Sequence, residues 1–326
     1  AGGSLRMALP DVEVGATMDF IGKVCTAGDD VPDAKELEVL LGLLVMRGET
    51  PMPPSELKGL HPLVLPLCKD SETGAVTGLL KMPLKPATDL PVVRQSGKSL
   101  ELLGPTMKQL IKRIVVEEDF NGTDKAKDAL SAAKGCGVDY TAGEAKVSPL
   151  GLEKFLLVKA GPFSDLYAWL AADWMKKGKQ EEALITCARA AGLIPEWGEQ
   201  HWTHSKTITE VGGRELEARD CARAALQMPL WTVRHDELEE MAETAETSME
   251  KLRKSYSKWC VTGGPEENFV NTGASDVQKA LGRANYLMDT VLLEDDKTWD
   301  SIREDLAGHY EDAKLPQTAA LVRGGQ

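Results

Sequence analysis

Apolar and polar positions follow one kind of pattern in the first third of this chain and another in its second half. Three short apolar runs, Pro62–Cys68, Ala75–Met82 and Leu90–Arg94, predict strands. The Lys-Asp-Ser-Glu-Thr-Gly segment between the first two runs is typical of a hairpin turn. From Pro162 onward, apolar residues recur at helical spacing with only short interruptions. The pattern therefore predicts a mainly α protein in which a small α+β module with a β-hairpin precedes a helical region.

Helical spacing also occurs twice around the predicted strands. Lys35–Arg47 carries leucines three and four residues apart and is followed by Gly48, a typical stop signal. A second helix is predicted with Pro105 in its first turn, where the missing N–H costs nothing. A short helix is expected over Lys125–Lys134. The Gly- and Pro-rich start, residues 1–33, is expected to be irregular.

The second half contains an internal repeat. The sequence Cys-Ala-Arg-Ala-Ala occurs at Cys187–Ala191 and again at Cys221–Ala225, an offset of 34 residues. The same offset relates Pro195 to Pro229, Trp197 to Trp231 and Gly178 to Gly212. A period of this length is typical of arrays of paired helices.

The repeated segment resembles a family. Asp165–Pro195 is similar to a tetratricopeptide (TPR) repeat at nearly every signature position, with Tyr167 for the usual Trp and Ala171 for the usual Gly. A second unit, Glu199–Pro229, departs more from the pattern. The resemblance implies a TPR-like array of αα-hairpins that binds peptides or proteins in a groove.

Three further helices are predicted after the repeats. Arg234–Lys258 is expected to form one long capping helix, because acidic residues early and basic residues late suit the helix dipole. Ser275–Leu292 and Thr298–Lys314 should form the last two. The expected domains are 1–150, an irregular start and the α+β module, and 151–326, the TPR-like region.

A second resemblance covers the first region. His61–Leu67, Thr77–Pro83, Pro91–Val93 and the helix over Ile111–Asp119 look like plastid TPR-like proteins of plants and algae. This resemblance implies a nuclear-encoded plastid (chloroplast) protein whose transit peptide ended before Ala1. It also implies a peripheral subunit or assembly factor of a photosynthetic membrane complex, such as a photosystem with its antenna, at the thylakoid.

Composition narrows the classes of partner. The chain has 51 acidic and 38 basic residues and a formal net charge of −13, which disfavours binding to nucleic acid. Its six cysteines include no Cys-x-x-Cys pair, so a zinc site or disulfide framework is not expected. The longest apolar run, Val39–Met46, is too short to span a membrane. We expect a soluble or peripheral protein whose partners are protein subunits.

Motifs for catalysis and cofactors are absent from the sequence. There is no Gly-x-Ser-x-Gly, His-Glu-x-x-His or glycine-rich phosphate loop. His201 and His204 have a spacing that zinc can use, but Glu199 is the nearest carboxylate and no third His or Cys lies close in the sequence. Two groove histidines are the preferred interpretation. We expect no metal, no cofactor and no enzymatic activity.

Candidate partner-binding residues follow from the repeat and from one basic helix. Aromatic residues near the repeat groove could serve an interface, where Trp is enriched, although packing between helices is the simpler explanation. Lys108, Lys112 and Arg113 form a basic helix face that would either be solvated or dock an anionic partner. The candidates around the groove are Tyr167, Trp174, Trp197, His201, His204 and Trp231.

The function expected from these observations is a non-catalytic scaffold or accessory subunit that docks onto a larger assembly. One alternative is an enzyme or cofactor-binding protein with a site between the two modules. A second is a chaperone adaptor. Ala168 and Ala172 weaken it, because they stand where the tetratricopeptide carboxylate clamp has Lys and Asn.

Overall fold

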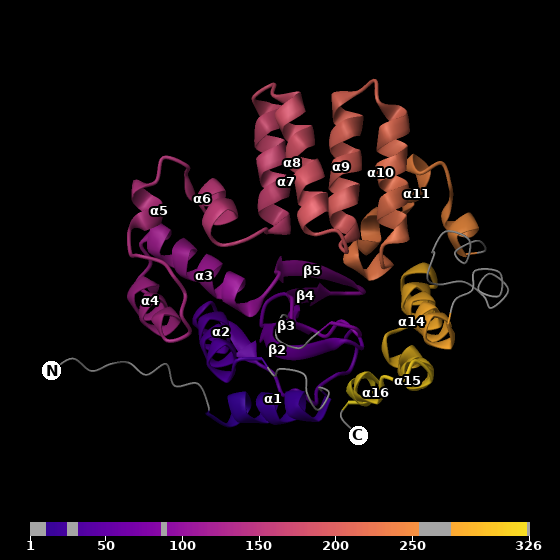
Figure 1. The fold of residues 1–326 in the computed structure, drawn as a ribbon, viewed down its shortest axis with the longest axis horizontal. Coiled ribbons are helices and arrows are strands. Elements are labelled where there is room, and N and C mark those ends of the chain that lie inside the picture. The colour runs from indigo at the N-terminus through magenta and orange to yellow at the C-terminus, as the bar shows by residue number, and fades with distance from the viewer. Residues whose placement is uncertain (1–10, 25–31, 86–89, 254–274, 325–326) are drawn as a thin grey trace. The chain divides into compact units, whose positions relative to one another are not determined.

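The computed structural model describes residues 11–24, 32–85, 90–253 and 275–324. The chain divides into two compact units. The first comprises residues 1–57, 63–95 and 102–166, and the second comprises 58–62, 96–101 and 167–326. The chain therefore passes twice from the first unit into the second before it stays there. Helices predominate and a five-stranded sheet lies in the N-terminal part, which confirms the mainly α prediction (Figure 1).

The sheet is built around the predicted hairpin. Its strands, in the order β1-β2-β3-β4-β5, are β1 (Glu49–Pro51), β2 (Val64–Asp70), β3 (Val76–Leu80), β4 (Val92–Ser96) and β5 (Ser99–Gly104). The pairs β1–β2, β2–β3 and β3–β4 are antiparallel. β3 is buried along its whole length and β2 along most of it, as their continuous apolar runs require. The two edge strands, β1 and β5, were not predicted.

Six helices accompany the sheet: α1 (Asp11–Val24), α2 (Ala34–Met46), α3 (Met107–Asn121), α4 (Ala126–Lys134), α5 (Glu144–Val147) and α6 (Leu152–Lys159). Side chains fix where two of them begin. The Asp33 carboxylate accepts a hydrogen bond from the Lys35 N–H at 2.8 Å, and the Thr106 hydroxyl accepts one from the Gln109 N–H at 3.2 Å. The expectation of an irregular start is wrong over residues 11–24, which form α1; residues 1–10 and 25–31 lie outside the described part.

Two helical hairpins open the C-terminal half. They consist of α7 (Ser164–Lys176) with α8 (Gln180–Leu193), and of α9 (Gly198–Val211) with α10 (Glu215–Gln227). Gly178 and Gly212 follow the first helix of each hairpin at positive φ angles of 71° and 79°. Only glycine adopts such angles without strain, so the two glycines related by the repeat offset each end the first helix of a hairpin.

The second helix of the second hairpin begins one residue later in its repeat than the second helix of the first hairpin does. α9 begins 34 residues after α7, but α10 begins 35 residues after α8. Ala183 on α8 is therefore matched in burial by Ala218 on α10, while Glu217 points to solvent. Equivalent residues of the two repeats consequently differ in burial. Ala188 in the first repeat is exposed, whereas its equivalent in the second repeat, Ala222, is fully buried.

The single helix expected over 234–258 is wrong. The described part has two 3-10 turns, η2 (Leu230–Thr232) and η3 (His235–Glu237), then α11 (Leu238–Thr244), and helix resumes at 249–253. Between these two helical segments, Glu246 has a left-handed backbone conformation with a φ of 57°, which breaks the helix. Arg219 and Arg223 on α10 stabilise this break, because Arg223 donates to the Ala245 carbonyl at 3.1 Å and Arg219 contacts the Glu246 carboxylate at 3.2 Å.

The last helices agree with the prediction. α14 (Asp276–Leu293) begins with a capping box between Ser275 and Gln278. It is followed by η4 (Asp300–Ile302), α15 (Arg303–Asp312) and a short helix that was not predicted, α16 (Pro316–Val322). Asp289 on α14 accepts a hydrogen bond from the Leu230 N–H at 2.7 Å, and burial raises the pKa of its carboxyl well above the usual value.

Residues 58–62 belong to the second unit, where they contact residues from its C-terminal part, and we call this segment the clasp. The Gly59 N–H donates to the Asp300 carboxylate at 2.9 Å, and the Leu60 carbonyl accepts from Arg303 at 2.7 Å. The buried His61 ring lies 4.7 Å from the ring of Trp231 and 4.5 Å from that of Trp299, measured between centroids. Burial, with the positive charge of Arg303, lowers the pKa of His61 to about 3, so the ring is neutral at physiological pH.

We predict that His61→Ala lowers the free energy of unfolding of the second unit by about 2–4 kcal/mol, because it removes a ring packed between two indoles. Urea unfolding followed by tryptophan fluorescence measures this difference, since Trp231 and Trp299 report on the same contact. His201→Ala, at a half-exposed position on α9, is the control and should change stability by less than about 0.5 kcal/mol. Equal effects of the two substitutions would contradict the clasp.

Candidate functional site

The first hairpin holds two of the candidate residues. Tyr167 is buried on α7. Trp174 is partly buried and packs against a small-residue cluster of Ala171, Ala183 and Cys187. Lys177 and Lys179 lie over the Trp174 ring, 5.6 and 4.9 Å from its centroid. Trp174 is therefore partly covered by this packing and by the two lysines, while Tyr167 serves the packing of the hairpin.

The two tryptophans beyond the repeat prolines belong to the interior. Trp197 and Trp231 are both buried, and their rings meet edge to face at 5.9 Å. Trp231 also contacts His61 of the clasp. The sequence interpretation that these indoles line a partner-facing edge is not supported by their burial. They fill the space between α9, η2 and the clasp instead.

The histidine pair does not assemble a metal site. His201 Nε2 lies 3.5 Å from the Pro195 carbonyl oxygen, and His204 Nδ1 lies 3.7 Å from Cys221 Sγ. Burial, and then the neighbouring His201, lower the pKa of His204. Within the described ranges no group of three or more His, Cys, Asp or Glu side chains is placed to hold a metal ion.

The three residues of the predicted basic helix face, Lys108, Lys112 and Arg113, differ in whether they form ion pairs. The Arg113 guanidinium is bound to Asp165 through two hydrogen bonds of 2.8 and 2.5 Å and to Glu117 at 2.8 Å, and it lies over the Phe163 ring. Arg113 is thus held within the first unit. Lys108 and Lys112 form no ion pair with any residue in the described part of the chain. Of the three candidates, only these two lysines are free to meet a partner.

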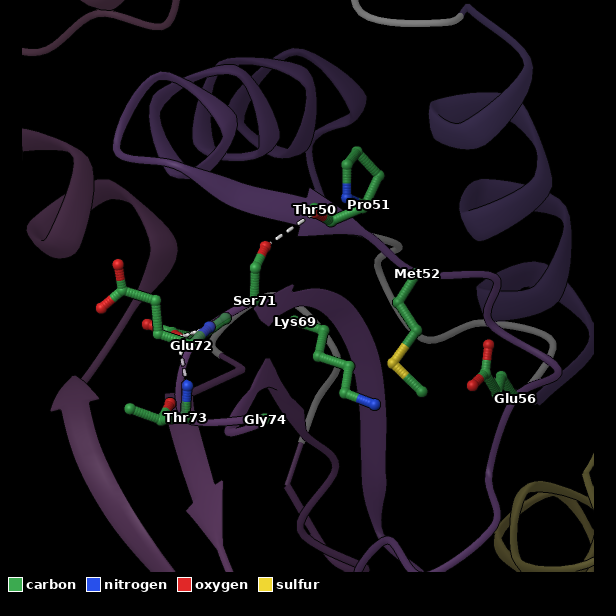
Figure 2. Close-up of a pocket in the computed structure, with 10 residues that line it drawn as sticks. Thr50, Pro51, Met52, Glu56, Lys69, Ser71, Glu72, Thr73 and Gly74 are labelled. Carbon is green, nitrogen blue, oxygen red and sulfur yellow. Dashed lines mark hydrogen bonds between the residues drawn. The ribbon is translucent and has the colours of Figure 1, made fainter.

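A hollow of about 620 Å³ lies in the first unit, where β1 meets the turn between β2 and β3. Thr50, Met52, Lys69 and Ser71 are among its lining residues, and the side chains of Lys69 and Met52 extend into it (Figure 2). The Asp70 carboxylate accepts hydrogen bonds from the turn N–H groups of Thr73 and Glu72, which lower its pKa. Asp70 therefore stabilises the hairpin turn. Sequence reasoning found this turn but not the hollow.

Two carboxyl groups, Glu199 on α9 and Glu237 on η3, influence each other, and sequence reasoning named only Glu199, as the carboxylate nearest the histidines. Burial raises the pKa of Glu199 to about 7, and the negative charge of Glu237 adds to this effect, while Lys206 and Arg234 oppose it. Glu237 accepts hydrogen bonds from the Trp202 indole and from Lys206. Glu199 Oε2 is buried without a hydrogen-bond donor among the described residues. None of these groups lines the hollow beside β1.

Ionisation of Glu199 makes the free energy of unfolding depend on pH, and the raised pKa fixes the direction of that dependence. Because its pKa is higher in the folded chain than the usual 4.5, its contribution to stability is present at low pH and is lost as the pH rises through about 7. We predict that Glu199→Gln raises the free energy of unfolding by about 1–3 kcal/mol at pH 8, with little effect at pH 5.

Denaturation at a series of pH values measures this effect. Glu210→Gln, at an exposed position on the same helix, is the control and should give a profile parallel to that of the unsubstituted chain. A Glu199→Gln profile that is also parallel would contradict the elevated pKa.

Comparison with known proteins places the chain in a family. Its residues 17–159 match the PAB N-terminal model, residues 164–248 the PAB middle domain and residues 240–324 the PAB C-terminal domain. No tetratricopeptide model is found, and no solved structure matches the chain.

The chain is also similar to a curated protein from Arabidopsis thaliana. This relative, Protein IN CHLOROPLAST ATPASE BIOGENESIS, chloroplastic, is 31% identical over 293 residues, which cover 88% of this chain and 85% of the relative. Among the described residues, no helix is long and apolar enough to cross a membrane. On the family matches and this similarity, the chain belongs to the PAB family.

Proposed function

We propose that the chain is a non-catalytic assembly factor for a membrane complex of the plastid, and that this complex is the plastid ATPase. The observation that carries the proposal is the similarity, along 88% of the chain, to a relative named for chloroplast ATPase biogenesis. The same similarity supports a plastid location. The photosystem with its antenna, which the sequence resemblance implied, becomes the competing complex.

The geometry of the site residues supports a binding role over an enzymatic one. His61, Glu199 and Asp289, whose pKa values are strongly shifted, are held in the interior by packing or helix contacts. The hollow beside β1 is lined by a turn, a methionine and a lysine rather than by an acid–base pair in hydrogen-bond contact. The proposed partners are protein subunits.

We propose that the two helical hairpins of the second half are similar to tetratricopeptide repeats in their helices but present a different binding surface. The two consecutive hairpins, α7–α8 and α9–α10, have the helix lengths and glycine stops of that repeat. The one-residue shift of α10 and the burial of Trp197 and Trp231 change the surface that the second unit presents. A chaperone adaptor stays the weaker alternative, because Ala168 and Ala172 provide no charge for a carboxylate clamp.

Loss of the protein tests this proposal. In a line that lacks the chain, native gel separation of plastid membranes should reveal a severalfold decrease in assembled ATPase, with the photosystems near their normal amounts. Reintroducing the unsubstituted chain should restore the ATPase.

A normal amount of ATPase in that line would contradict the proposal. A selective loss of photosystem with its antenna would instead indicate that the photosystem, and not the ATPase, is the complex that the chain helps to assemble.

A further inference from the structure

Two carboxyl groups join the start of α9 to η3 and the residue before it, which we call the η3 segment. Glu199, in the first turn of α9, accepts a hydrogen bond from the backbone N–H of Arg234. Glu237, the last residue of η3, accepts hydrogen bonds from the Trp202 indole and, at 2.7 Å, from Lys206 Nζ, both on α9. Each of the two elements therefore supplies one carboxyl group to donors on the other.

The backbone around these contacts is closely packed. The N–H of Gly198, the residue before Glu199, donates to Thr232 Oγ1 at 2.9 Å. A Cβ atom at Gly198 would lie only 2.7 Å from the Val233 side chain and 3.1 Å from the Ala225 carbonyl oxygen. Because such packing leaves little room for α9 to shift, a change at Glu199 acts on the η3 segment instead.

One oxygen of Glu199 lies where a negative charge is poorly stabilised. Glu199 Oε2 is buried without a hydrogen-bond donor in the described part of the chain. Such an oxygen is stable when the carboxyl group is protonated and costly when it is ionised. Burial and the negative charge of Glu237 accordingly raise the pKa of Glu199 to about 7, so its charge changes near neutral pH.

The charged groups that act on Glu199 come from α9 and from the η3 segment. They are Lys206 on its own helix, and Glu237 and Arg234 on the segment. η2 and the last turn of α10, which also pack against α9, carry no charged side chain, and the charged residues of α8 are exposed. The other titratable side chains of the two elements have other partners or face solvent: Asp236 pairs with Arg234, His235 with the Leu292 carbonyl, His201 with the Pro195 carbonyl and His204 with Cys221, while Glu210 is exposed.

We propose that Glu199 and Glu237 form a pH-sensitive latch, which holds the η3 segment on α9 while Glu199 is protonated and releases it when Glu199 ionises. In the closed state the junction holds one negative charge, that of Glu237, which Lys206 balances. Loss of the proton adds a second charge whose Oε2 atom has no donor, so hydration of this atom and repulsion from Glu237 favour release. The latch does not depend on which complex the chain assembles.

Hydrogen–deuterium exchange of the purified full-length chain at pH 6 and pH 8 tests the latch, with labelling times scaled to the intrinsic exchange rate at each pH. The Glu199 pKa is about 7 in the closed state and returns to its usual 4.5 on release, so protection of residues 234–245 should fall about tenfold between these pH values. Urea separates this release from global unfolding. Because release exposes little surface, exchange of these residues at pH 8 should stay constant up to about 1 M urea.

Three variants assign the effect to the two carboxyl groups. Glu199→Gln keeps the size of the side chain but cannot ionise, so protection should be the same at both pH values. Glu237→Gln removes the neighbouring negative charge and lowers the pKa of Glu199, so the fall in protection should be smaller. Glu210→Gln, at an exposed position on the same helix, is the matched control and should keep the tenfold fall.

Constant protection in the unsubstituted chain would overturn the inference. So would a fall that persists unchanged in Glu199→Gln or in Glu237→Gln, or exchange at pH 8 that rises with urea as global unfolding does.

Discussion

The His61 ring, packed between the indoles of Trp231 and Trp299, is the contact on which the second unit depends. It lies in residues 58–62, which come between β1 and β2 in the sequence but belong to the second unit together with residues 96–101 and 167–326. The neighbouring backbone groups are fixed by Asp300 and Arg303, so the segment is bound by hydrogen bonds as well as by packing. A neutral ring satisfies this site, because a charged imidazole would lose its hydration there.

Local patterns predicted the elements whose partners are close in the sequence. The β2–β3 hairpin, α2 and the stop at Gly48 follow from turn chemistry and helical spacing. β1 could not be predicted, because its three residues carry no strand pattern of their own and pair with β2 across a gap in the sequence. The break at Glu246 depends on arginines from α10, a tertiary contact that a charge pattern along one helix does not contain.

The candidate site was predictable only in part, and for a similar reason. Aromatic residues at helical spacing serve equally for packing and for binding, and the burial of Trp231 depends on His61, far away in the sequence. Residues that are identical in the two repeats also lie in different environments, because α10 begins one residue later in its repeat than α8 does. Lys108 and Lys112 were found from the helical pattern, because a solvent-facing charge needs no long-range contact to be recognised.

Burial of Trp197 and Trp231 leaves Lys108 and Lys112, and not these indoles, as groups that the proposed assembly factor can offer to a partner. Two-dimensional native separation of plastid membranes, with quantification of the chain against ATPase subunits, tests the proposed assembly role most directly. We expect the chain to co-migrate with partial ATPase assemblies and to be far less abundant than the complete complex. Co-migration with a photosystem at equal stoichiometry, or with no ATPase subunit at all, would contradict the account.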